Sequence, residues 1–220
     1  MLMLAPVLTI DGPSGAGKGT VSRLVAKKLG WHYLDSGSIY RSVAIAIQKA
    51  SINLGDISEI VKVTQAMVLE FECADALIVK LNGINITDQL GLESTGNIAS
   101  QVAAIPEVRA ILLQKQKDFR QLPGLVADGR DMGTVVFSDA ENKVFLTASA
   151  EKRAERRYKQ LIEKEIDANL ATIKSEIEAR DCRDMERENA PLAMASDALY
   201  IDSSDMTINS VVEEVLNLIR

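Results

Sequence analysis

The sequence has few cysteines, one histidine and no excess of basic residues, and each deficit excludes a class of protein. Cys73 and Cys182 lie far apart and form no CxxC pair, so we expect no disulfide framework and a reducing compartment. The net charge of −6 argues against a general nucleic-acid or membrane-surface binder, which carries a basic excess. It still allows a small anionic ligand held by a few local cations. The lone His32, beside Trp31, is expected to be packed or partly exposed, not catalytic.

Long apolar runs are also missing, and none approaches the length of a transmembrane helix. The opening MLMLAPVLTI lacks a basic region and a cleavage site, and Pro6 and Asp11 bracket it. We interpret it as a lead-in and a buried strand, not as a signal peptide, and we expect a soluble, cytoplasmic protein. The 220 residues, 47% hydrophobic and 25% charged, suffice for one substantial core with smaller lobes attached.

What the sequence does contain is a rhythm of short apolar runs and amphipathic stretches. Val7–Ile10 is typical of a strand buried on both faces, and Thr20–Leu29 of a helix capped by Gly30. A second strand at 31–35 and a helix at 38–50 complete a βαβ unit. Three more strands are expected at 124–131, 142–148 and 198–202, and a last helix at 207–220, capped by Asp205 or Thr207.

Two segments depart from this rhythm. Residues 63–90 alternate like strands, with turn signals at Ala74–Asp75 and Asn82–Gly83, and predict a small antiparallel insert. Residues 151–190 mix acidic and basic side chains, as in a solvated helical appendage. Helices are expected between these segments at 94–104 and, after Pro106 in a first turn, at 107–121. The sequence predicts an α/β protein: a five-stranded, mostly parallel sheet with helices on both faces, a β insert and charged helices.

A glycine-rich segment follows the first strand. It reads Gly12, Pro13, Ser14, Gly15, Ala16, Gly17, Lys18 and matches seven positions of the P-loop GxxxxGK[ST] between a strand and a helix. Glycines let the backbone curl so that N–H groups point inward, and the helix adds its N–H groups and positive dipole end. Lys18 supplies a full charge for the phosphate being transferred. We expect this bend to bind a nucleoside triphosphate; the alternative is a simple glycine-rich turn.

The eighth position of the motif is Gly19, and the hydroxyl comes one residue later at Thr20. The hydroxyl that usually ligates Mg²⁺ is therefore displaced, and its role here stays open. A guanine-nucleotide switch is disfavoured, because the partial matches at 88–91 and 142–145 lie in the wrong context. A motor is disfavoured because no glutamate follows the Walker-B-like strand 125–128. A small kinase remains.

Arginines are the second chemical signal, because phosphoryl transfer needs the developing negative charge neutralised. Arg130 follows the carboxyl end of a predicted strand, where open α/β sheets bind ligands. Two other groups are spaced to share helical faces, Arg153 with Arg156 and Arg157, and Arg180 with Arg183 and Arg187. The alternative for each of these arginines is a surface ion pair.

Five stretches together resemble the bacterial cytidylate kinase family, whose members make CDP from CMP and ATP. They are DGPSGAGKGT, LDSGSIYR, ASQVAAIPEVR, GLVADGRDMGTVVF and ARDCRDMERENAPL. The resemblance covers nearly the whole chain, and Gly19–Thr20 is normal among nucleoside monophosphate kinases. It implies a single P-loop kinase domain with a core at 1–37, 106–150 and 191–220, a monophosphate-binding region at 38–105 and a lid at 151–190.

The resemblance also implies roles for individual residues. ATP would be held by residues 12–20 with the lid residues Arg156 and Arg157, and CMP by Ser36, Arg41, Ser100, Arg109, Arg130, Asp131, Arg180, Asp184 and Arg187. The catalytic charges would be Lys18, Arg130, Arg157 and Arg187. Mg²⁺ would accompany ATP, held through phosphates and water. No general base is assigned, because the acceptor oxygen is already anionic.

Cytosine chemistry agrees with this assignment. A carboxylate such as Asp131 can accept from N4, while Arg109 or Ser100 can donate to N3 or O2. Uracil reverses the pattern at N3 and N4, so such a site disfavours UMP. The alternative for Asp131 is a helix cap or a salt bridge. The resemblance implies a cytoplasmic monomer of pyrimidine metabolism with no nucleic-acid or membrane partner. Two alternatives stay open: a kinase for UMP, AMP or shikimate, and a switch that binds triphosphate without transferring it.

Overall fold

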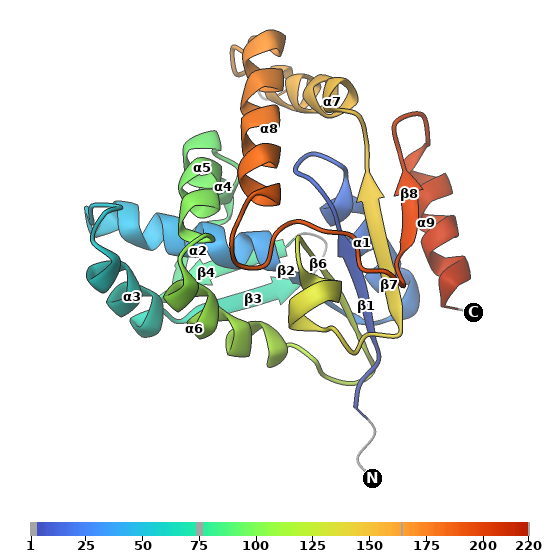
Figure 1. Cartoon of the computed structure of the whole chain (residues 1–220), viewed down its shortest axis with the longest axis horizontal. Coiled ribbons are helices and arrows are strands. Elements are labelled where there is room, and N and C mark those ends of the chain that lie inside the picture. The colour runs from blue at the N-terminus through green and yellow to red at the C-terminus, as the bar shows by residue number, and fades with distance from the viewer. Residues whose placement is uncertain (1–3, 74–76, 164, 220) are drawn as a thin grey trace. The chain divides into compact units, whose positions relative to one another are not determined.

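The structure, a computed structural model, describes residues 4–73, 77–163 and 165–219. The chain divides into two compact units (Figure 1). The first combines Met1–Leu34 with Phe119–Arg220, and the second is Asp35–Asp118. Each unit has its own sheet.

The sheet of the first unit has five strands in the order β2-β6-β1-β7-β8. The pairs β1–β6, β1–β7 and β7–β8 are parallel, which confirms the predicted parallel sheet. Its strands are β1 (Val7–Asp11), β2 (His32–Asp35), β6 (Leu125–Gly129), β7 (Asn142–Thr147) and β8 (Leu199–Asp202). All residues of β1 and β6 are buried, as the continuous apolar runs predicted.

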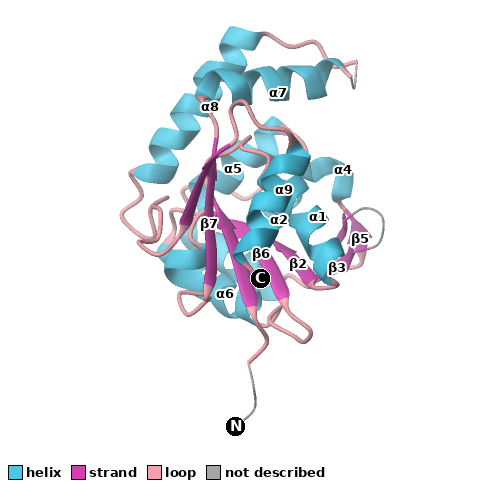
Figure 2. Cartoon of the chain, turned by 90° about the vertical axis from the view of Figure 1, so that its right-hand side faces the viewer, coloured by secondary structure: helices cyan, strands magenta, loops and turns pink. Residues whose placement is uncertain are grey.

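The register of β1 and β6 assigns their side chains to the two faces of the sheet. Ile10 pairs with Asp128, so both side chains point to one face. Helix α1 (Lys18–Leu29) lies on that face, because its Gly19 is beside Asp128, and α9 (Ile208–Leu218) packs against α1 (Figure 2). Asp11 points to the opposite face, where the short π-helix η1 (Met132–Val136) packs on β1 and β6. The sheet is thus covered on both faces.

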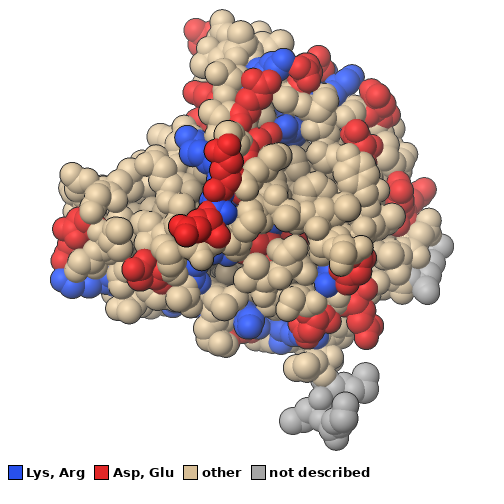
Figure 3. All heavy atoms as spheres, viewed as in Figure 1, with Lys and Arg blue, Asp and Glu red and all other residues tan. Residues whose placement is uncertain are grey.

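Two further helices of the first unit, α7 (Ala150–Ile162) and α8 (Leu170–Met185), form a hairpin. Ala154, Ile173 and Ile177 are buried between them. The outward side chains are charges of both signs, interspersed along the hairpin in Figure 3. Side chains cap both N-termini, Ser149 for α7 and Asn169 for α8. The predicted charged helical appendage is confirmed, and the cap of α9 is Thr207.

The second unit contains the antiparallel insert. Strands β3 (Leu69–Cys73), β4 (Leu77–Leu81) and β5 (Ile84–Asn85) form a three-stranded sheet in that order. Asn82 and Gly83 turn between β4 and β5 with φ of 51° and 78°, which confirms that turn. The predicted turn at Ala74–Asp75 lies outside the described residues. The helices are α2 (Ser36–Lys49), α3 (Ile57–Ala66), α4 (Thr87–Leu90), α5 (Glu93–Val102) and α6 (Pro106–Lys117).

One helix of the second unit, α3, was not predicted, although Asp56 caps it by accepting from the backbone N–H of Glu59. Helix α6 packs against α3. A hydrogen bond of 2.6 Å from Ser36 Oγ to Gln116 Oε1 ties α6 to the start of α2. The unit therefore runs from 35 to 118, beyond both ends of the predicted region 38–105.

Candidate active site

The phosphate loop connects β1 to α1 at the carboxyl edge of the sheet. Strand β1 lies between β6 and β7, so the loop leaves the sheet at the point where the strand order reverses, where open α/β sheets bind ligands. Gly12, Gly15 and Gly17 have φ of 148°, 78° and 92°. A Cβ on Gly12 would lie 1.9 Å from the carbonyl oxygen of Leu146, so the backbone there approaches β7 too closely for any side chain.

Side chains outside the loop hold its carbonyl groups. Arg153 donates to the Ser14 carbonyl at 3.0 Å, and Ser203 Oγ, whose hydroxyl also donates to the Thr147 carbonyl at 2.9 Å, lies 3.4 Å from the Ala16 carbonyl. In a planar trans peptide the next N–H points away from the carbonyl. These contacts therefore aim the following N–H groups away from Arg153 and Ser203. Helix α1 begins at Lys18, directly after the loop, and no side chain caps its N-terminus. The first backbone N–H groups of α1 therefore suit an anion.

Lys18 is 7% exposed, and its Nζ donates to the Pro13 carbonyl at 2.8 Å. Burial, together with the positive charge of Arg130, lowers the pKa of the Lys18 ammonium to about 7. The carboxylates Asp128 and Asp11 oppose this shift. Lys18 thus places a titratable ammonium group in the protein interior at the mouth of the loop, and bound phosphates would stabilise its charged form.

Asp11, at the end of β1, anchors the start of η1. Its carboxylate accepts from the backbone N–H groups of Met132 at 2.8 Å and Gly133 at 2.7 Å. Burial raises the pKa of Asp11 to about 6, although both hydrogen bonds favour the ionised form. Because η1 starts directly after Asp131, Asp11 fixes the backbone that presents this candidate cytosine-binding residue. Asp131 itself is 3% exposed.

Asp128 and Tyr33 occupy the space beside Gly19. The Tyr33 hydroxyl donates to Asp128 Oδ2 at 2.7 Å. A Cβ built on Gly19 would lie 3.4 Å from the Tyr33 hydroxyl oxygen and 3.8 Å from Asp128 Oδ2. The position where most P-loops carry a hydroxyl side chain therefore faces a hydroxyl and a carboxylate from β2 and β6. Thr20, the next residue, is partly exposed.

Arg130, directly after β6, forms a buried ion pair with Asp184 of α8. Arg130 Nε donates to Asp184 Oδ2 at 2.7 Å, and the two side chains are 17% and 5% exposed. Burial alone would lower the pKa of Arg130, but the negative charge of Asp184 more than offsets this and raises it. Arg187 is 3.9 Å from the second oxygen of Asp184. Arg180 also acts on Asp184, and the arginines together lower its pKa in spite of burial. Four predicted acceptor residues are thus clustered.

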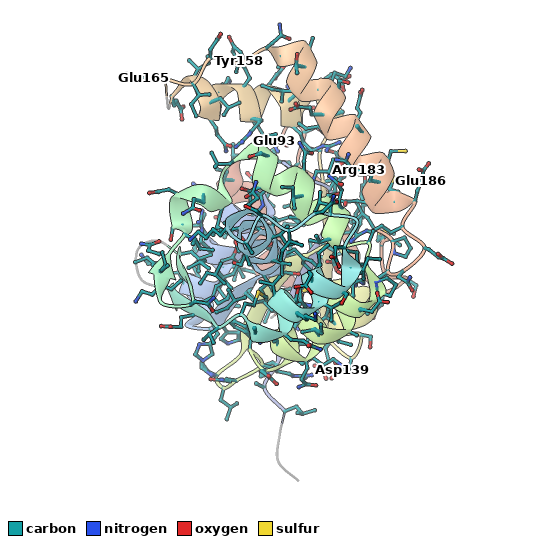
Figure 4. The ribbon with its side chains drawn as sticks, turned by 90° about the vertical axis from the view of Figure 1, so that its left-hand side faces the viewer. Glu93, Asp139, Tyr158, Glu165, Arg183 and Glu186 are labelled. Atoms are coloured by element: carbon teal, nitrogen blue, oxygen red, sulfur yellow. The ribbon has the colours of Figure 1, made fainter. Side chains whose placement is uncertain are left out.

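The arginines of the α7–α8 hairpin separate into different environments. Arg153, 5% exposed, points to the phosphate loop. Arg156 donates to the Ser203 carbonyl at 2.6 Å, and Arg157 is partly exposed. The predicted common face of Arg180, Arg183 and Arg187 is only partly realised, because α8 ends at Met185 and Arg187 follows it. Arg180 and Arg187 are partly buried, whereas Arg183 is exposed (Figure 4).

The second unit holds the other predicted acceptor residues. Ser36 is buried at the start of α2, and Arg41, one turn later, donates to the Leu90 carbonyl. Ser100 is 6% exposed on α5. Arg109 Nη1 is 3.5 Å from the Ala103 carbonyl. Helices α2 and α5 pack together, so Ser36, Arg41 and Ser100 come from neighbouring helices, while Arg109 lies on α6.

Comparison with known proteins agrees with the geometry of the loop. The family model for cytidylate kinase matches residues 8–220. The chain belongs to the cytidylate kinase family. It is therefore a phosphotransferase of the (d)CMP kinase kind and a nucleotide kinase.

The solved structures that resemble the chain have low sequence identity to it. TT1252 from Thermus thermophilus is 15% identical, with 99% of this chain and 97% of that chain covered and a TM-score of 0.48. Shikimate kinase from Acinetobacter baumannii is 18% identical, with 98% and 93% covered and a TM-score of 0.44. A gluconokinase from Sinorhizobium meliloti 1021 is 15% identical, with 97% and 90% covered and a TM-score of 0.43.

Sequence reasoning did not assign a role to several residues that shape this cytidylate kinase-family site. Asp11 was interpreted as the end of a strand, and Asp128 as the end of a Walker-B-like strand that no glutamate follows. Their shared signal is that each ends a buried strand of one parallel sheet, which brings them to the same edge. Tyr33 and Ser203 gave no such signal, because nothing in their local sequence indicates contact with a distant loop.

The acidic side chains of the site do not by themselves make a metal centre. Among the described residues, no group of three or more His, Cys, Asp or Glu could hold one. Both oxygens of Asp11 accept backbone N–H groups, while Asp128 accepts from Tyr33. These side chains do not form a cage, but they fit a metal carried by the triphosphate and ligated largely by water.

No helix among the described residues is long and apolar enough to span a membrane.

Proposed function

We propose that the chain transfers the terminal phosphoryl group of ATP to CMP or dCMP, giving ADP and CDP or dCDP. The observation that carries this proposal is the arrangement at the carboxyl edge of the sheet. A phosphate loop with buried Lys18 lies in the same unit as the cluster of Arg130, Arg180, Asp184 and Arg187. The first suits a triphosphate and the second an anionic acceptor.

In this proposal the loop N–H groups, the start of α1 and Lys18 hold the ATP phosphates. Lys18 follows the transferred group, since its flexible stem places a single charge. Arg130, Arg157 and Arg187 neutralise the charge that develops on the phosphoryl oxygens. Mg²⁺ would accompany ATP, held through the phosphates and water, and would offset part of the phosphate charge. The acceptor is an anionic oxygen, so positioning and charge neutralisation suffice without a base.

Specificity for cytosine would come from Asp131, Ser100 and Arg109. Asp131 would accept from the N4 amino group, and Ser100 and Arg109 would donate to N3 and O2. Ser36, Arg41 and Arg180 would hold the rest of the acceptor nucleotide, and Arg156 and Arg157 would close over ATP. Asp131 and Ser100 are 3% and 6% exposed, which supports selectivity. A base that presents an acceptor where the site also presents an acceptor loses more binding free energy in a buried site than in water.

Closure over both nucleotides would exclude water, the competing acceptor. The α7–α8 hairpin is the proposed lid, because its arginines lose hydration favourably only when phosphates are present. We further propose a cytoplasmic monomer without a nucleic-acid partner, which the pI of about 5.0 supports. Light scattering of the purified protein checks the monomer.

The experiment is a screen of monophosphates with ATP, detecting ADP. CMP and dCMP should be used much faster than UMP, AMP or shikimate, and equal use would overturn the specificity argument. Asp131→Asn should reduce the efficiency with CMP by about 10²-fold while ATP affinity stays unchanged. If Asp131→Asn keeps wild-type CMP kinetics, the carboxylate has a structural role instead.

A further inference from the structure

Arg153 is buried on a helix whose other charged residues face solvent or the surface. It is 5% exposed, and its three guanidinium nitrogens bind three separate segments. Nε donates to the Ala148 carbonyl at 2.8 Å, Nη1 to the Ser14 carbonyl at 3.0 Å and Nη2 to Asp181 Oδ2 at 2.6 Å. One side chain thus connects the end of β7, the phosphate loop and helix α8.

The contact with Ser14 controls the orientation of the next peptide N–H. Because the peptide is planar and trans, an Arg153 nitrogen on the Ser14 carbonyl directs the N–H of Gly15 to the opposite side. The stem of Arg153 also lies against the loop. A Cβ built on Gly15 would be 3.2 Å from Arg153 Cβ and 3.6 Å from its Cγ. Arg153 therefore supports the loop from behind, on the side away from that N–H.

The contact with Asp181 extends this support to α8. The Asp181 side chain is 12% exposed, so the pair is largely removed from water. On the same helix, Arg180 and Asp184 are proposed acceptor-binding residues, and Asp184 pairs with Arg130. A shift of the phosphate loop would displace the Arg153–Asp181 pair and, with it, this part of α8.

We propose that Arg153 is a positioning residue for the ATP phosphates, and that its pair with Asp181 couples ATP binding to the acceptor-binding end of α8. The coupling rests on the proposed function. The positioning role does not, because it concerns ATP binding alone.

Arg153→Lys tests the positioning role. It keeps the charge, but one ammonium group cannot replace a planar fork with three separate acceptors. Affinity for a non-hydrolysable ATP analogue, measured by calorimetry without an acceptor, should fall about tenfold. The melting temperature is measured on the same samples.

Arg120→Lys is the matched control. Arg120 also joins a backbone carbonyl, that of Ala5 at 2.7 Å, to a carboxylate, that of Asp139 at 2.6 Å. These groups precede β1 and β7, at the opposite edge of the sheet from the phosphate loop, and Figure 4 shows Asp139 far from α7 and α8. Arg120→Lys should keep the analogue affinity within about twofold of wild type, whatever stability it loses.

Asp181→Asn tests the coupling. Wild-type protein should bind CMP about fivefold or more tightly when the analogue is present. Asn keeps a hydrogen-bond acceptor but loses the negative charge. The enhancement of CMP affinity by the analogue should therefore shrink toward unity, while the affinity for the analogue alone stays close to that of wild type. An enhancement equal to wild type would refute the coupling.

Two results would overturn the positioning role: wild-type analogue affinity in Arg153→Lys, or an equal loss in Arg120→Lys, which would reveal a general stability effect. Failure of wild-type protein to bind CMP would instead refute the proposed acceptor. The coupling is then measured with the monophosphate that the screen identifies, and the Arg153→Lys affinity decides the positioning role as before.

Discussion

The phosphate loop and the α7–α8 hairpin are both proposed to bind anionic phosphates, but they are built on different chemical groups. The loop relies on its backbone, whose conformation depends on three glycines with positive φ and one lysine. The hairpin relies on arginine side chains, and those with the same helical spacing have different surroundings: Arg153 is buried, whereas Arg183 is exposed. The comparison teaches that a backbone site can be predicted from residue order, whereas a side-chain site depends on which distant partner each residue meets.

The largest effect is expected from Lys18→Ala, within the loop. Removing the only ammonium group of the motif should reduce the turnover rate by about 10³-fold, because this charge neutralises the transferred phosphate in a buried site. Circular dichroism should show an intact fold. Turnover like that of wild type would refute the assignment of the loop.

Gly12→Ala tests the backbone side of the comparison. Its Cβ would lie 1.9 Å from the Leu146 carbonyl oxygen, so the loop must shift, at a cost of about 3 kcal/mol in unfolding free energy. Gly30→Ala is the control, since Gly30 also has positive φ, 67°, but open space around it. It should cost about 1 kcal/mol in urea denaturation. Equal losses would show that φ alone matters at Gly12.

Arg157→Ala and Arg183→Ala test the part of the comparison that concerns arginine side chains. Arg157, partly exposed in the free protein, should contact phosphate in the closed complex, so its loss should reduce the turnover rate by about 10²-fold. Arg183→Ala should change the rate by less than about twofold. Steady-state kinetics with saturating ATP measures both. Equal effects of the two variants would refute the distinction between these arginines.

The smallest effect concerns protons. In the free protein the pKa of Lys18 is lowered to about 7 by burial and by Arg130, while bound triphosphate favours the charged form. Binding should therefore take up about one proton at pH 8.5 and about half a proton at pH 7, and ATP affinity should fall as pH rises above 7. Calorimetry in buffers of different ionisation enthalpy measures the uptake. Lys18→Ala should abolish it, and equal uptake in that variant would assign the proton elsewhere.

Much of the fold could be predicted from local patterns. The five strands of the parallel sheet have apolar runs, and the β4–β5 turn has Asn82–Gly83 with its need for positive φ. Helix α3 was missed because its single cap, Asp56, precedes a segment rich in β-branched residues. The packing of α6 was not predicted, because it depends on α3 and on the distant Ser36–Gln116 hydrogen bond.

The candidate site shows the same division. The order of residues along the chain was enough to determine the phosphate loop, because every group in it comes from one short segment between a strand and a helix. Only the tertiary structure decided that Asp11 holds η1, that Tyr33 binds Asp128 beside Gly19, and that Arg153 supports the loop. These contacts join residues 95 to 139 positions apart. The parallel sheet and the hairpin bring such residues together, and no local pattern encodes that proximity.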